Sequence, residues 1–117
     1  MENQNHMGSP KHNIDKMIDE VLTNFNFHRV YLTMKALNWT WFPANEPPHI
    51  ERMKETADHL LRRCVEGSLE CKNLSPNEPY FSATGGFKAY CYRSKHKHIL
   101  SVHLEFIVSE WESDGDS

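Results

Sequence analysis

Histidine and cysteine side chains are frequent enough in this sequence to raise the question of a metal site. The 117 residues include eight histidines and three cysteines. His96 and His98 would share one face of a strand, with Cys91 and His103 near them across a predicted hairpin. A structural zinc site needs four well-placed ligands, and no C-x-x-C or H-x-x-x-H pair supplies them. We interpret these histidines as solvated loop residues and expect no metal and no cofactor.

Groups that could act in catalysis are few. The segment Thr84-Gly85-Gly86 lacks the partners that a phosphate loop or a nucleophile elbow requires, so we interpret it as a tight turn that uses positive φ angles. His28, Asp58, His59 and Cys64 could in principle form a triad. Cys64, however, lies on the apolar side of a predicted helix, where a thiol is usually inert. We therefore expect no catalytic residues and no enzyme.

A basic stretch near the C-terminus is a candidate nucleic-acid site. It has no acidic residue between Glu78 and Glu105. Aromatic residues alternate with its cations, as base stacking combined with phosphate contact requires. The residues of this site are Lys88, Tyr90, Tyr92, Arg93, Lys95 and Lys97. The alternative is a solvated turn in which lysines protect an exposed strand edge, and the net charge of −3 favours that alternative.

Aromatic residues also gather near the ends of the predicted elements. A domain of this size has too little core to bury every one of them, and an incompletely buried aromatic cluster is typical of a protein-binding surface. The six candidates are Trp39, Trp41, Phe42, Tyr80, Phe81 and Trp111. The opposing interpretation is that Trp39 and Trp41 complete a small core.

Composition predicts a single globular domain in the cytoplasm. The chain is long enough for one core, and 38% hydrophobic with 25% charged residues is a globular balance. No apolar run approaches a membrane span, and residues 1–10 contain no apolar signal core. An odd number of cysteines without close pairing favours reduced thiols, which fits the cytoplasm. We expect no membrane partner.

Apolar spacing of three and four residues predicts three helices. The first runs from about residue 11 to 25 and the second, capped by Asn26, from about 27 to 38. The third begins after Pro47-Pro48 and ends at Gly67. Their apolar sides should face a common core.

The C-terminal part changes to a period of two, which predicts strands. Residues 87–92 and 100–108 form a β-hairpin with a turn longer than two residues, placed at 94–98. The β-prone segment 39–42 offers a third strand, and residues 68–84 are expected to form a loop. The predicted fold is α+β, with three helices on a small antiparallel sheet, in the order α-α-β-α-β-β. Residues 1–12 form a disordered lead, 13–111 the domain and 112–117 an acidic flexible tail.

Four segments resemble small uncharacterised proteins that bacteriophages and prophages encode. They are Phe25-Asn26-Phe27, the stretch from Met34 to Trp41, Thr84-Gly85-Gly86-Phe87 and the stretch from Phe106 to Trp111. The resemblance covers most of residues 20–111 in order, and these motifs carry no assigned chemistry. It implies a phage accessory protein, and small proteins of this kind commonly bind and block a host factor.

The leading hypothesis is accordingly a non-catalytic phage accessory protein, acting as a monomer or a homodimer, that binds and modulates or inhibits a host or defence-system protein. It would act in the host cytoplasm through the aromatic surface or the edge of the hairpin. One alternative is a nucleic-acid-binding module that uses the basic hairpin. Another is a protein that sequesters a small molecule or nucleotide between helices and sheet.

Overall fold

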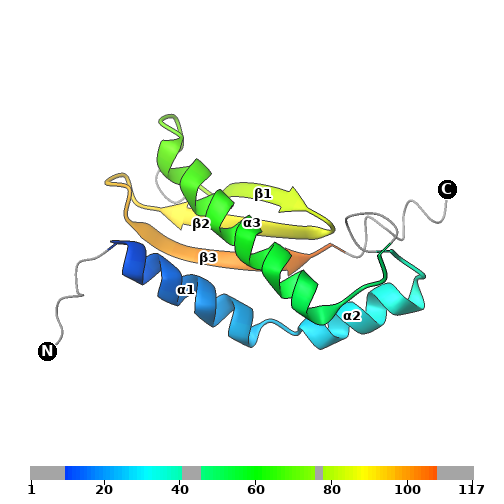
Figure 1. Ribbon diagram of the computed structural model, residues 1–117. Helices are drawn as coiled ribbons and strands as arrows, with labels where there is room; N and C mark the ends of the chain where they lie inside the picture. Colours follow the sequence, from blue (N-terminus) through cyan, green and yellow to red (C-terminus); the bar gives the residue numbers. More distant parts are fainter. Residues whose placement is uncertain (1–9, 41–45, 76–77, 108–117) are drawn as a thin grey trace, which may run out of the picture.

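The computed structural model describes residues 10–40, 46–75 and 78–107. They form an α+β fold in which the helices lie on one side of a three-stranded antiparallel sheet (Figure 1), which confirms the predicted class. The elements are α1 (Pro10–Asn24), α2 (Phe27–Ala36), α3 (Ile50–Glu70), β1 (Tyr80–Thr84), β2 (Phe87–Arg93) and β3 (Ile99–Phe106). No helix of the described ranges combines the length and apolar character that crossing a membrane requires.

The predicted termini fall largely outside the described residues. The acidic tail at 112–117 lies there entirely, as does most of the lead at 1–12. Helix α1 nevertheless begins at Pro10, inside the range expected to be a lead. Proline suits the first turn of a helix because its fixed φ angle is already helical and its missing N–H has no partner to lose.

Helices α1 and α2 form as the apolar spacing predicts. The side chain of Asn26 accepts a hydrogen bond from the backbone N–H of Arg29 at 3.0 Å, which confirms it as the cap of α2. Helix α2 ends at Ala36, slightly earlier than expected, and Asn38 adopts a positive φ of 56°. Asparagine tolerates this left-handed conformation better than most residues, so the chain can turn there towards α3.

Helix α3 buries its apolar stripe against the sheet, and it continues past the predicted stop at Gly67 to Glu70. Gly67 allows close packing and does not end the helix. A Cβ atom at Gly67 would lie 2.4 Å from Oη of Tyr80, so the missing side chain lets the tyrosine ring pack against the helix. The prediction of a helix end was wrong because a glycine needed for close packing looks the same in sequence as a glycine that ends a helix.

The third strand does not come from the segment that was predicted to supply it. Trp39 and Thr40 are not in a strand, and Trp41 and Phe42 lie outside the described residues. Strand β1 instead occupies residues 80–84, at the end of the expected loop. The order of the described elements is therefore α-α-α-β-β-β, and β2 is the central strand.

The two hairpins have different turns. Thr84 pairs with Phe87 across Gly85 and Gly86, whose φ angles are 58° and 90°. Positive φ at both central residues is what a two-residue turn of type I′ requires, so the interpretation of these glycines is confirmed. The turn between β2 and β3 is longer, as predicted, and is closed by a hydrogen bond from the N–H of Ser94 to the carbonyl oxygen of His98 at 2.9 Å.

An aromatic cluster joins the helices to the sheet at one end of the molecule. Phe87 is fully buried, with ring centroids of Phe25 and Phe27 each 5.9 Å away and that of Phe106 5.5 Å away. Trp39 stacks on Phe106 at 5.6 Å. All four segments that carry the phage resemblance contribute a described residue to this cluster or to the turn beside it. In the described part of the chain these segments therefore have a packing role.

Substitution of Gly86 by alanine should destabilise the fold. Its φ of 90° is unfavourable for alanine, and the added Cβ would lie 2.5 Å from Cη2 of Trp39. The free energy of unfolding should fall by about 2 kcal/mol or more, because both the left-handed backbone and the clash add to the cost. Chemical denaturation followed by circular dichroism measures this.

Gly85→Asn is the matched control in the same turn. Asparagine accepts positive φ, and Asn-Gly is a preferred pair for this type of turn. The control should unfold at nearly the wild-type denaturant concentration. Equal losses for the two variants would contradict the role assigned to the contact between Gly86 and Trp39.

Candidate functional site

The sheet face turned away from the helices is the candidate functional site, and we call it the open face. Strand β2 alternates between buried and partly exposed residues along its whole length. Cross-strand partners of the partly exposed residues lie on the same side, which fixes the members of the face from the register. The open face consists of Phe81, Ala83, Lys88, Tyr90, Tyr92, Ser101, His103 and Glu105.

Lys88 lies among aromatic rings at one end of the open face. Its Nζ atom is 4.8 Å from the ring centroid of Phe81 and 5.7 Å from that of Tyr90. The two rings are themselves 6.2 Å apart, and Phe81 is 57% exposed. Cation–π attraction holds the lysine over the rings, so the charge and the apolar surface are presented together.

Cross-strand contacts fix the other aromatic side chains of the open face. Oη of Tyr90 donates a hydrogen bond to Oε1 of Glu105 at 2.9 Å, and this bond raises the pKa of the tyrosine above its usual value. The rings of Tyr92 and His103 meet edge to face at 5.7 Å. Paired side chains lose less rotamer entropy on binding than free ones do, so the face is preorganised for recognition.

The structure brings together most of the residues of the predicted nucleic-acid site. Lys88, Tyr90 and Tyr92 share the open face, and Lys95 and Lys97 are exposed in the turn beyond it. Arg93 was wrongly included in the predicted site. Its side chain is only 3% exposed, and its guanidinium donates a hydrogen bond to the carbonyl oxygen of Cys71. Its odd number places it on the buried side of β2, opposite to the even-numbered residues.

The six predicted protein-binding aromatics do not form one surface in the described part of the chain. Trp39 is half-buried in the aromatic cluster, and Tyr80 is half-buried against α3 at the other end of β1. Phe81 is exposed and belongs to the open face. The other three, Trp41, Phe42 and Trp111, lie outside the described residues.

Besides the small residues Ala83 and Ser101, the open face contains two residues, His103 and Glu105, that were absent from both predicted binding sites. Their signal was present, because both alternate with apolar residues along the second strand of the predicted hairpin. The exact pairing was needed to place His103 opposite Tyr90 and Glu105 opposite Lys88. The turn length sets this pairing, and the sequence specified it only as longer than two residues.

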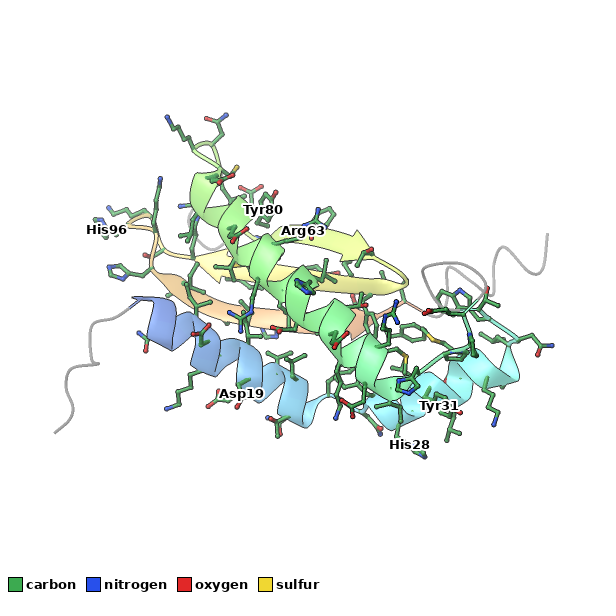
Figure 2. All side chains as sticks on the ribbon, in the orientation of Figure 1. Asp19, His28, Tyr31, Arg63, Tyr80 and His96 are labelled. Atoms are coloured by element: carbon green, nitrogen blue, oxygen red, sulfur yellow. The ribbon has the colours of Figure 1, made fainter. Side chains whose placement is uncertain are left out.

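Histidines and cysteines do not converge on a metal site in the described ranges, where no three potential ligands form a group. Figure 2 shows His96 at the tip of the turn between β2 and β3 and His28 on α2, at opposite ends of the molecule. Cys91 is buried on the helix side of the sheet, whereas His103 belongs to the open face.

Cys64 is a packed structural thiol. It is completely buried on α3, and its Sγ atom donates to the carbonyl oxygens of Tyr80 at 3.2 Å and Ala89 at 3.4 Å. Burial raises its pKa to about 12. At neutral pH the Cys64 thiol is therefore protonated and shielded, which is unsuited to nucleophilic attack.

Asp58, another member of the triad considered above, accepts a hydrogen bond from Arg62.

Two surface cavities are candidates for a small ligand. One of about 480 Å³ lies between α1 and β3 and has no lysine or arginine in its lining. The other, of about 420 Å³, lies beside the turn after β2 and includes His96, Lys97 and His98 in its lining. Neither brings convergent buried polar groups to a ligand position, so both are weaker candidates than the open face.

Comparisons with known proteins identify no relative. No family model, curated protein or solved structure matches the chain. The function of the chain therefore has to be inferred from the geometry of the open face.

Thiol labelling should distinguish the three cysteines. At pH 8 a thiol reagent should modify half-buried Cys71 first and leave Cys64 and Cys91 unmodified, since burial raises the pKa of both thiols and also excludes the reagent. Mass spectrometry of labelled peptides measures the order. All three should react in denaturant, and rapid labelling of native Cys64 would contradict its assignment as a packed thiol.

Proposed function

We propose that this chain is a non-catalytic binding protein and that the open face is its contact surface. The observation that carries the proposal is a sheet whose helices lie on one side (Figure 1) and whose register places aromatic rings on the other. Phe81, Tyr90 and Tyr92 have no core to fill on that side, yet they are fixed by cation–π, hydrogen-bond and ring contacts. Rigid aromatics of this kind are typical of binding hot spots.

A protein is the proposed partner. Tyrosine and phenylalanine are enriched in the buried centres of protein interfaces. Lys88 and Glu105 already have partners within the face, and this reduces the cost of covering their charges. The phage resemblance adds that the partner is a host or defence-system protein, which the chain would inhibit in the host cytoplasm.

Loss of two central rings should abolish capture of this partner. Tyr90→Ala combined with Tyr92→Ala removes the middle of the face while leaving the buried side of β2 intact. Each ring at a hot spot contributes about 2 kcal/mol, so the affinity of the double variant should fall by at least about 100-fold. Pull-down from bacterial lysate identifies the partner, and calorimetry with the purified partner measures the loss.

Leu32→Ala is the matched control, because Leu32 is 50% exposed on α2 and lies outside the open face. It should capture the same partner with wild-type affinity. A partner that binds wild type and the double tyrosine variant equally well would refute the open face as the contact surface. Circular dichroism of the double variant should match wild type, so that a loss of binding reports the face and not the fold.

Single-stranded nucleic acid is a second candidate partner. From Tyr80 to Ile107 the sequence contains four basic residues, Lys88, Arg93, Lys95 and Lys97, against the single carboxylate of Glu105. Although Arg93 is buried, Lys88 lies over the ring of Tyr90, and Lys95 and Lys97 are exposed in the turn that follows β2. Stacking contributes about 1–3 kcal/mol for each base, and a narrow sheet face is wide enough for a single strand.

Titration with oligonucleotides separates this candidate from a protein partner. If it is correct, fluorescence anisotropy at low salt should detect binding of labelled oligothymidine or oligouridine. Lys95→Gln with Lys97→Gln should weaken this binding and reduce its dependence on salt, because fewer counterions are released. No binding of either oligonucleotide at low salt would eliminate the candidate.

A further inference from the structure

Strand β1 is an edge strand with little protection. The strand order β1-β2-β3 gives it one neighbour, and beyond its ladder with β2 no described backbone group pairs with the backbone of residues 80–84. Edge strands are usually protected by charged residues, proline or a covering element. The sequence Tyr-Phe-Ser-Ala-Thr of β1 contains no charge and no proline. The opposite edge strand, β3, carries the charged residue Glu105.

The size of the open face also indicates that more surface is needed. Three strands of about seven residues cover roughly 300 Å², from the rise along a strand and the spacing between strands. A stable protein interface buries about 800 Å² on each partner. One copy of the open face is therefore too small for a stable protein complex, whereas two joined copies approach the required area.

We propose that β1 pairs antiparallel with β1 of a second copy of this chain, with the two-fold axis at Ser82. In this register Phe81 of one copy faces Ala83 of the other, and Tyr80 faces Thr84. A large ring then lies over a small side chain on the open face, and no charged residue of one β1 faces the other. The product is a continuous six-stranded sheet with both open faces on the same side.

The helix layer covers one end of β1 and leaves the other end open. Figure 1 shows α3 crossing the strands obliquely, over the Tyr80 end of β1 and away from its Thr84 end, and the packing of Tyr80 on Gly67 agrees with this. The two-fold axis places the Tyr80 end of one copy beside the Thr84 end of the other. The two α3 helices therefore lie at opposite ends of the paired strands. Strand pairing needs no other partner, so this inference goes beyond the proposed function, and only the argument from area rests on that function.

Sedimentation velocity over a wide range of protein concentration tests the inference. Wild type should move from 13.7 kDa to twice that mass as concentration rises. Ala83→Lys places a charge at the pairing edge on an exposed position and should raise the dissociation constant of the dimer about tenfold or more. Ala83→Glu should do the same with the opposite charge, which separates an edge effect from a change in net charge.

His103→Lys is the control, because it adds the same charge to the open face on β3, away from the pairing edge. It should dimerise like wild type, and all three variants should keep the wild-type circular dichroism spectrum. A chain that stays monomeric at every concentration would overturn the inference, as would equal dimerisation of Ala83→Lys and His103→Lys. Loss of a captured partner by Ala83→Lys in a chain that stays monomeric would report on the open face, to which Ala83 belongs, and would also overturn the inference.

The double tyrosine variant distinguishes this inference from the proposed function. Tyr90 and Tyr92 lie on β2, so their substitution should leave the dimer mass unchanged while partner binding is lost. A dimer that captures its partner without these rings contradicts the proposed function alone. A monomer that needs the rings for capture contradicts the inference alone.

Discussion

The burial of Phe87 is the interaction on which the rest of the structure depends. Its ring meets Phe25 and Phe27 from the junction of α1 and α2, and Phe106 from the end of β3. Three parts of the chain that are distant in sequence are thereby held together by one side chain. The backbone reaches this position through a turn whose second residue must be glycine, because Trp39 occupies the space that a Cβ atom of Gly86 would need. The turn and the ring therefore have to be considered together.

Helices and the C-terminal hairpin could be predicted because each pattern is local. Apolar residues spaced by three and four, and an alternation of period two, can each be recognised within one segment without knowing which elements pack against it. Strand β1 could not be predicted in the same way. Its five residues follow a segment rich in serine, asparagine and proline, and only pairing with β2 distinguishes them from more loop. Gly67 was misinterpreted for a related reason, since the packing of Tyr80 against it is a tertiary contact.

The candidate site shows the same limit. Alternation correctly grouped Lys88, Tyr90 and Tyr92. The same alternation places odd-numbered Arg93 on the opposite, buried side of β2, so its inclusion was wrong. Phe81, His103 and Glu105 joined the site only when the register of both hairpins was known. Alternation within one strand shows which of its residues share a face of the sheet. Which residues of neighbouring strands lie beside them depends on the pairing register, and the sequence alone did not give that register.

The connection between α3 and β1 is held at both of its ends. Tyr80 packs on Gly67 at the start of β1, and buried Arg93 donates to the carbonyl oxygen of Cys71 at the end of α3. Because these contacts keep the helix and the strand in place, the chain between them need not have a particular length. Each doubling of a loop costs only about 0.6 kcal/mol in closure entropy. The exposed residues Lys72 and Asn73 are thus a suitable place to insert an epitope or a fluorescent reporter without disturbing the sheet.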